Sequence, residues 1–153
     1  MSTTLVEPTV SLDNLGFLLA KASQRFNERL VERLAEQGFA EVRGSYGSVL
    51  MPLFEQDHLR VGEIGARARL SKQAMTRLVA QCEADGLVRR SRDAADGRAF
   101  RVDLTPRGQE LRSVVQRVLT QLDDEVLAQL GRRDIDALRA ALKGVMELRG
   151  MRP

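Results

Sequence analysis

The side chains best suited to reading a nucleic acid lie at the start of a predicted helix over residues 72–85. They are Lys72, Gln73, Thr76 and Arg77. If Leu78 and Cys82 face the protein interior, these four side chains lie on the opposite, exposed side of the helix. Arginine or lysine can pair with guanine and glutamine with adenine in a major groove, so this face could distinguish base pairs. Ser71, which is expected to cap the helix, completes this first candidate contact set.

A second candidate group lies in a predicted turn between two strands, at residues 87–92 and 99–104. Arg98 stands at the tip of this turn, where its guanidinium could enter a DNA minor groove. Asp96, two positions earlier, is expected to hold that guanidinium in place. The alternative is a surface ion pair that only stabilises the turn, which is worth at most about 1 kcal/mol. Five neighbouring arginines suit phosphate contacts and a solvated surface equally well: Arg67, Arg69, Arg89, Arg90 and Arg92.

The spacing of apolar residues predicts the long helices around these two groups. Steps of three and four residues predict a helix over residues 12–37 and another from Pro106 to about residue 130. Thr105 directly before the proline is a strong helix start, because threonine can accept an amide hydrogen bond there. A final helix is expected from Asp134. Its inward residues are expected to be Ile135, Leu138, Leu142 and Val145.

Shorter elements fill the middle of the chain. Ser45 is expected to cap a helix that ends near Gln56 and is kinked or limited by Pro52. Residues 59–61 are expected to form a very short strand and residues 62–68 a short helix, which a tight turn joins to the helix described first. Two such helices form a helix-turn-helix, and the strand ribbon after it forms a wing. The predicted fold class is therefore mainly α with a small β-wing (α+β).

The wing sequence resembles that of the MarR family of bacterial regulators. The family pattern DxRxxxxxLT corresponds to Asp96, Arg98, Leu104 and Thr105 within DGRAFRVDLT. The preceding stretch SKQAMTRLVAQCEADGLVRR is similar to the recognition helix and first wing strand of that family. With the order of helices, the resemblance covers about residues 12–148.

This resemblance implies a homodimer built from four segments. They are a flexible arm (1–10), an N-terminal dimerisation helix (11–43), a winged helix-turn-helix (44–105) and C-terminal dimerisation helices (106–150). A two-fold dimer would bind double-stranded DNA at a palindromic operator. The resemblance further implies a repressor that a small aromatic or anionic effector releases. Phe26, Arg43 and Tyr46 are expected to border the effector cleft.

Composition and residue types limit which other classes of protein the chain could belong to. The net charge is +3, and residues 60–107 hold eleven basic and six acidic residues, so the rest of the chain is mildly acidic. Apolar runs of four or five residues are too short to cross a bilayer, and the N-terminus lacks a secretory signal, so a cytoplasmic protein is expected.

The residue inventory also argues against metal, cofactor and enzyme chemistry. One cysteine and one histidine cannot form a disulfide or a structural zinc site. No phosphate-binding glycine loop or paired catalytic carboxylates are present, so the chain is not expected to be an enzyme or to need a cofactor. Cys82 is expected to be a packing residue rather than a redox sensor. The main alternative to a DNA regulator is a winged-helix module that binds a protein partner.

Overall fold

The computed structural model describes residues 9–148, and most of the predicted N-terminal arm lies outside them. The helices are α1 (Leu15–Glu36), α2 (Gly47–Glu55), α3 (Val61–Ala68), α4 (Lys72–Ala84), α5 (Pro106–Leu130) and α6 (Arg132–Met146), with a short 3-10 turn at Gly44–Tyr46. The strands are β1 (Leu59–Arg60), β2 (Val88–Arg92) and β3 (Phe100–Leu104). The predicted fold class is confirmed. No helix in the described part is long and apolar enough to cross a membrane.

Side-chain caps explain where the long helices begin. The Asn14 carboxamide oxygen accepts a hydrogen bond from the Phe17 amide at 2.9 Å, so α1 starts at Leu15 rather than at residue 12. Thr105 caps α5 as predicted, because its hydroxyl accepts from the Gly108 amide at 3.1 Å. Only Gly131, with a φ of 84°, separates α5 from α6, which therefore begins two residues earlier than expected.

The prediction that Ser45 caps the second helix is wrong. Ser45 lies inside the 3-10 turn, where the Tyr46 amide donates to the Arg43 carbonyl at 3.0 Å. Tyr46 is fully buried and its hydroxyl bonds to the carboxylate of Asp85 on the far side of the core. The 3-10 turn stands where the cap was expected, and α2 then starts without a side-chain cap and runs through Pro52 to Glu55.

The three strands form one antiparallel sheet in the order β1-β3-β2. Leu59 of β1 pairs with Val102, and Val88 of β2 pairs with Leu104. The short strand at the start of the helix-turn-helix therefore extends the wing ribbon, a pairing that the sequence pattern did not predict. It joins the wing to the residue immediately before α3.

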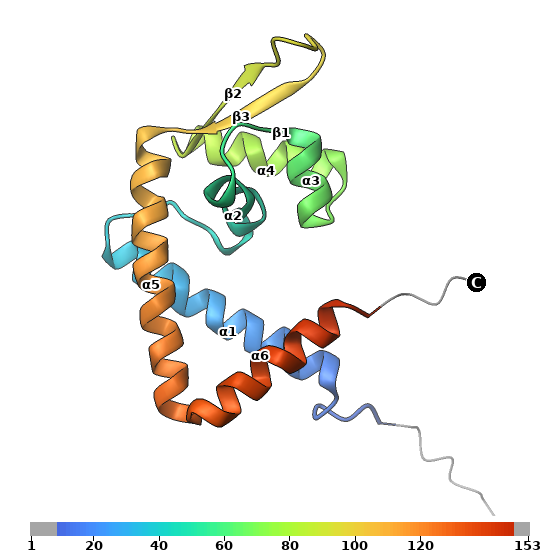
Figure 1. Ribbon diagram of the computed structural model, residues 1–153, viewed down its shortest axis with the longest axis vertical. Coiled ribbons are helices and arrows are strands. Elements are labelled where there is room, and N and C mark those ends of the chain that lie inside the picture. The colour runs from blue at the N-terminus through green and yellow to red at the C-terminus, as the bar shows by residue number, and fades with distance from the viewer. Residues whose placement is uncertain (1–8, 149–153) are drawn as a thin grey trace, which may run out of the picture.

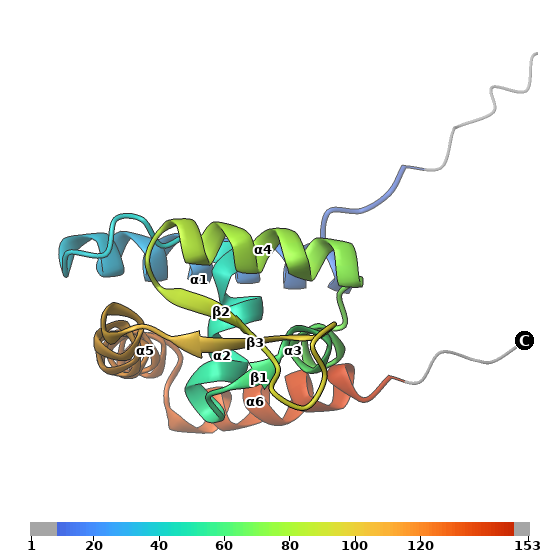
Figure 2. The ribbon, with the colours of Figure 1, turned by 90° about the horizontal axis from the view of Figure 1, so that it is seen from above.

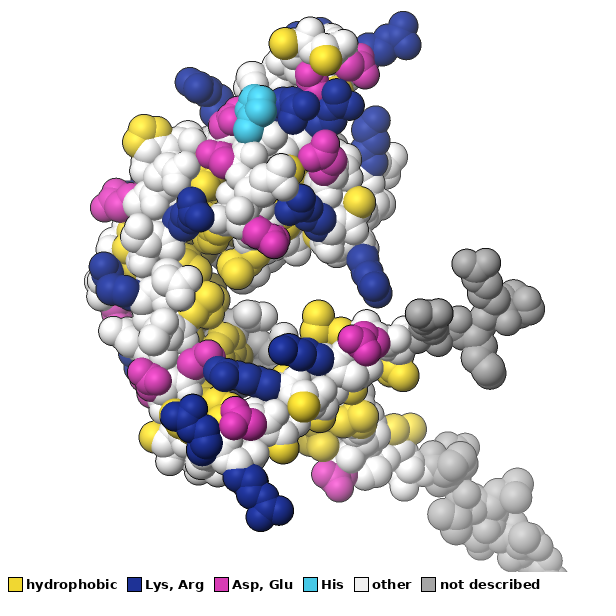
Figure 3. Space-filling model, viewed as in Figure 1, with side chains coloured by type: hydrophobic (Ala, Val, Ile, Leu, Met, Phe, Trp, Pro, Cys, Tyr) yellow, Lys and Arg dark blue, Asp and Glu magenta, His cyan; other side chains and the backbone are white. Residues whose placement is uncertain are grey.

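The molecule has two lobes connected by α5 (Figure 1). One lobe holds α2, α3, α4 and the sheet, and its core includes Val49, Ile64 and Val102, each fully buried. The other lobe is formed by α1, the second half of α5 and α6. Figure 3 shows an open hollow between the lobes on one side of the molecule.

The second lobe leaves apolar side chains uncovered. Of the α6 residues expected to face inward, Ile135 is buried, but Leu138 and Leu142 are 41% and 37% exposed, so that prediction is wrong for the single chain. The reason is that α6 packs mainly against α5, and no other part of residues 9–148 covers this face of it. Leu15 and Leu18 of α1 are exposed as well.

Candidate DNA-binding surface

The inward face of α4 determines which of its side chains reach solvent. Met75, Val79 and Cys82 are buried against the core, while Leu78 is only half-buried. The inward face is therefore turned slightly from the one predicted from Leu78 and Cys82. The predicted contact residues still lie on the outward side, and all five are exposed: Ser71, Lys72, Gln73, Thr76 and Arg77.

Two features fix the N-terminal end of α4. The Ser71 hydroxyl accepts a hydrogen bond from the Ala74 amide at 3.2 Å, which satisfies one of the free donors of the first turn. Arg69 takes a left-handed backbone conformation with a φ of 53°, and the Leu70 amide bonds back to the Gly65 carbonyl at 3.1 Å. The turn between α3 and α4 is thus tight and hydrogen-bonded, which holds the two helices as one helix-turn-helix.

The exposed α4 side chains differ in whether they already have a hydrogen-bond partner in the protein. The Thr76 hydroxyl donates to the Lys72 carbonyl at 2.8 Å, so it is engaged within the helix. Within residues 9–148, the side chains of Lys72, Gln73 and Arg77 have no hydrogen-bond or ion-pair partner. These three side chains are therefore available to an external partner, and two of them are positively charged.

At the wing turn, Asp96 acts on the backbone of Arg98 and not on its guanidinium. Its carboxylate accepts a hydrogen bond from the Arg98 amide at 3.0 Å. The guanidinium of Arg98 makes no ion pair or hydrogen bond with any described residue. The prediction that Asp96 holds the guanidinium is therefore wrong, because a residue two positions away in a tight turn is closer to the amide than to the end of the side chain. Arg98 is left exposed and unpaired.

A buried carboxylate at the base of the wing was missed by sequence reasoning. Asp93 is only 4% exposed and is bound by Arg60 and Arg101. The pKa of Asp93 is lowered, first by the hydrogen bond from the Ala95 amide and then by the two arginines, while burial opposes the shift. An aspartate followed by two alanines is a weak turn signal, and nothing in the sequence indicates a partner 33 residues away.

Of the five neighbouring arginines, three are held by the protein itself. Arg90 forms an ion pair with Glu83 at 3.0 Å, and Arg92 donates to the Gly97 carbonyl at 2.9 Å. Arg67 donates to the carboxamide of Gln56 at 2.9 Å. Arg69 and Arg89 are exposed. Figure 3 shows Lys and Arg side chains gathered around the wing and the adjoining helices.

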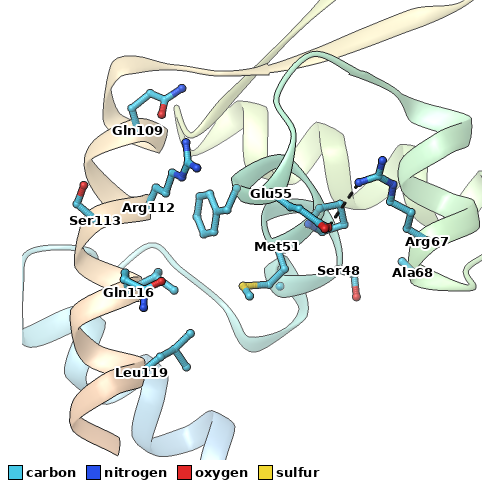
Figure 4. Close-up of a pocket in the computed structure, with 14 residues that line it drawn as sticks. Ser48, Met51, Glu55, Arg67, Ala68, Gln109, Arg112, Ser113, Gln116 and Leu119 are labelled. Atoms are coloured by element: carbon cyan, nitrogen blue, oxygen red, sulfur yellow. Dashed lines mark ion pairs between the residues drawn. The ribbon is translucent and has the colours of Figure 1, made fainter. Parts of the chain in front are cut away.

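A cavity of about 1320 Å³ lies between α2, α3 and α5 (Figure 4). Arg112 and Gln116 of α5 face Met51 of α2 across it, and the ion pair between Glu55 and Arg67, at 3.7 Å, lies on the side towards α3. The cavity therefore has a lining of mixed polar and apolar side chains, and one of its arginines, Arg112, has no partner within residues 9–148.

None of the three predicted effector residues lines this cavity. Tyr46 is 1% exposed, and burial together with the hydrogen bond to Asp85 raises the pKa of its hydroxyl to about 12. Phe26 is half-buried against the core, and Arg43 is exposed on the loop before α2. Tyr46 and Phe26 therefore pack in the core and Arg43 lies at the surface, and their role as effector contacts stays a prediction.

Cys82 lies in the core of the lobe that holds α2, α3, α4 and the sheet. Its side chain is fully buried, and burial raises the pKa of the thiol to about 12, with a smaller contribution from Asp85. Reactive cysteines need an exposed and stabilised thiolate, and Cys82 has neither. The structure supports the packing role expected for it.

The sequence of the chain is similar to a known family and to proteins named as transcriptional regulators. A sequence profile described as "MarR family" matches residues 49–99, which run from α2 to the wing. The HTH-type transcriptional regulator TtmR of Methylorubrum extorquens is 35% identical over 113 residues, which are 73% of this chain but only 56% of TtmR. An uncharacterised HTH-type transcriptional regulator of Mycobacterium bovis is 32% identical over 94 residues, 61% of this chain and 66% of the relative. These relatives are named as regulators and not as enzymes.

Solved structures confirm the winged-helix fold at low sequence identity. The transcriptional repressor CouR bound to a 23-mer DNA duplex has a TM-score of 0.75 and 22% identity, covering 92% of this chain and 100% of CouR. The PcaV regulator of Streptomyces coelicolor, in complex with its natural ligand, has a TM-score of 0.70 and 20% identity, covering 92% of this chain and 97% of PcaV.

Proposed function

Because this chain belongs to the MarR family, we propose that it is a DNA-binding transcriptional regulator that acts as a homodimer on a palindromic operator. The observation that carries the proposal is the free polar face of α4 beside a free Arg98 at the wing. Figure 2 looks down on this side of the molecule and shows α4 and the β2–β3 ribbon next to each other, with no other element over them. The α4 face suits a major groove and Arg98 the adjacent minor groove.

The contact residues that we propose are those at the start of α4 and at the wing tip: Ser71, Lys72, Gln73, Thr76, Arg77 and Arg98. Lys72, Gln73 and Arg77 are the readers of base edges or phosphates, since their side chains have no partner within residues 9–148. Asp96 contributes by fixing the backbone amide of Arg98. Ser71 contributes by capping the helix.

The uncovered apolar faces of α1 and α6 support the homodimer. Leu15, Leu138 and Met146 are 63%, 41% and 74% exposed, an arrangement that costs free energy unless a partner covers it. A two-fold partner bound through these helices would place two α4 helices on successive turns of one duplex. This geometry is the reason for expecting a palindromic operator.

The cavity between α2, α3 and α5 supports release of DNA by an effector. It separates the helix-turn-helix from α5, so a ligand bound there could change the angle between the two lobes. Arg112 would pair with an anionic group, while Met51 and Leu119 would pack against an aromatic ring. The proposed function is accordingly that of a repressor, which a small aromatic anion releases from DNA. The PcaV regulator, with a similar fold, was solved with its natural ligand.

Fluorescence anisotropy with the DNA upstream of the chain's own gene tests the DNA-binding function. The logarithm of the affinity should fall linearly with the logarithm of salt concentration, because binding releases counterions from phosphates. Arg98→Ala should weaken binding roughly tenfold or more and make the salt dependence shallower. Arg132→Ala on α6, which removes the same charge away from the proposed surface, is the matched control and should bind like the wild type.

Two results would count against parts of the proposal. Absent or salt-insensitive binding would favour a winged-helix module that binds a protein partner instead of DNA. Benzoate, as a simple aromatic anion, should lower the affinity of the wild type for DNA and act less on Arg112→Gln. If benzoate and related aromatic carboxylates leave binding unchanged, the effector part of the proposal is wrong.

A further inference from the structure

Asp93 is the one charged side chain that is buried within residues 9–148, and its carboxylate is fully used. One carboxylate oxygen accepts a hydrogen bond from the Ala95 amide at 2.9 Å. The other oxygen binds the Nε atoms of Arg60 at 2.6 Å and of Arg101 at 3.2 Å. The Asp93 amide also donates to the Ala99 carbonyl at 2.9 Å. Backbone and side chain together make this residue the junction at the base of the wing turn.

The two arginines come from two different strands of the sheet. Arg60 ends β1 and is the N-cap residue of α3, which begins at Val61, so it lies at the start of the helix-turn-helix. Arg101 belongs to β3, the strand that returns from the wing tip. The Asp93 carboxylate therefore ties the wing turn at residues 93–99 both to its own hairpin and to the start of α3.

The charge of Asp93 runs against a simple electrostatic role. A carboxylate lowers the positive charge of a surface that is proposed to bind phosphates, so on charge alone its loss should strengthen DNA binding. Burying it is also unfavourable unless it is fully paired. Any favourable contribution of this carboxylate to DNA binding must then come from its contacts. These contacts bear on the position of the wing relative to α3 and α4.

We propose that Asp93 is a positioning residue that clamps the wing to the helix-turn-helix and thereby sets where Arg98 meets the DNA. This inference rests on the proposed DNA-binding function. Asp93 fixes the start of the turn through the Ala95 amide, and Asp96 fixes its tip through the Arg98 amide. Without the clamp, the turn stays connected by its strands but can swing relative to α4.

Asp93→Asn is the variant that tests the clamp. An asparagine has one acceptor oxygen and an NH₂ group in place of the second oxygen. It can keep the bond from the Ala95 amide, but its NH₂ group cannot accept from Arg60 or Arg101. Both arginines are partly exposed, with 38% and 26% of their side chains accessible, so water can solvate them and the variant should fold. Circular dichroism and a thermal melt check that it does.

Amide hydrogen exchange of the DNA-free protein measures how firmly the wing turn is held, without any need for DNA binding. In Asp93→Asn the amides of residues 93–99 should exchange several-fold faster than in the wild type, while those of α4 and α5 should not change. Equal exchange rates in the wing turn would overturn the clamp. This measurement does not depend on whether the proposed function is right.

A double-mutant cycle in DNA affinity tests the action through Arg98. Asp93→Asn should weaken binding roughly tenfold although it removes a negative charge, and it should cause no further loss in the Arg98→Ala background. Glu63→Gln makes the same charge change at an exposed α3 residue without a partner in the described chain, and it should bind as the wild type or slightly better.

The outcomes of the cycle are distinguishable. Tighter binding by Asp93→Asn, or a loss that adds fully to that of Arg98→Ala, would overturn the positioning role. A wild type that does not bind DNA would instead contradict the proposed function, and the exchange measurement would still report on the clamp.

Discussion

Gly108 lies in the first turn of α5, where this helix packs closely against the winged helix-turn-helix. A substitution at this position tests how close that packing is. A Cβ atom added at this position would lie 2.2 Å from the Leu87 carbonyl oxygen and 3.2 Å from Cδ2 of Leu104. The same carbonyl accepts a hydrogen bond from the Thr105 amide at 3.1 Å, so it cannot turn away without losing that bond. With an added Cβ, the backbone at residue 108 or 87 must move by about 1 Å to restore an ordinary contact distance.

Gly108→Ala should therefore destabilise the protein despite the better helix propensity of alanine. Overpacking typically costs about 1–3 kcal/mol, and the 2.2 Å approach to a backbone oxygen places this site at the upper end, while the propensity gain is about 1 kcal/mol. The expected net loss is about 2 kcal/mol in the free energy of unfolding, a large part of a typical total of roughly 5–15 kcal/mol.

Guanidinium unfolding followed by circular dichroism measures this loss. Protein concentration has to be the same for all variants, since dimerisation couples to stability. The midpoint should fall in Gly108→Ala without a change in the slope. Gly62→Ala is the matched control, because Gly62 also lies in the first turn of a helix and an added Cβ there meets no atom within 4 Å. Equal midpoints for Gly108→Ala and the wild type would refute the close packing of α5 on Leu87.

Three further predictions concern the lobe that holds α4 and the wing. Cys82, with a thiol pKa of about 12, should resist iodoacetamide at about pH 8 until the protein is unfolded, and rapid labelling of the native protein would contradict its burial. Bonds from Arg90 lower the pKa of Glu83 below 4.5, so its stabilising contribution is present above that value and is lost as pH falls through the folded-state pKa. The stability difference between wild type and Glu83→Gln should accordingly shrink on acidification, and a constant difference would exclude this linkage. Ser71→Ala should lower the unfolding free energy by about 0.5–2 kcal/mol through loss of the α4 cap, whereas Ser113→Ala on exposed α5 surface should change it little.

Features determined by nearby residues were predictable from the sequence. Ser71 and Thr105 cap their helices through amides three residues away, so residue type and position suffice to predict them. The same holds for the short α3 with buried Ile64. Ser45 has equally good local chemistry, but it lies in a 3-10 turn whose Tyr46 is buried and bonded to Asp85, 39 residues away, a contact that no local pattern marks.

Features that depend on distant contacts were not predictable in this way. Asp93 meets Arg60 only after β1 has paired with β3, so no local pattern marks it. The cavity draws residues from α2, α3 and α5, so no single local pattern marks its lining, and none of Phe26, Arg43 and Tyr46 belongs to it. The inward pattern of α6 was correct in period, yet no element within residues 9–148 covers Leu138, which is exposed.

Photo-crosslinking tests most directly whether α4 and the wing are the DNA-binding surface. A photoreactive phenylalanine analogue would replace Gln73 on α4, Gly97 beside the wing tip or, as a control, exposed Gln121 on α5. With the DNA upstream of the gene, positions 73 and 97 should crosslink and unlabelled upstream DNA should compete better than unrelated DNA. Crosslinking at position 121 with none at 73 and 97 would contradict the proposed surface.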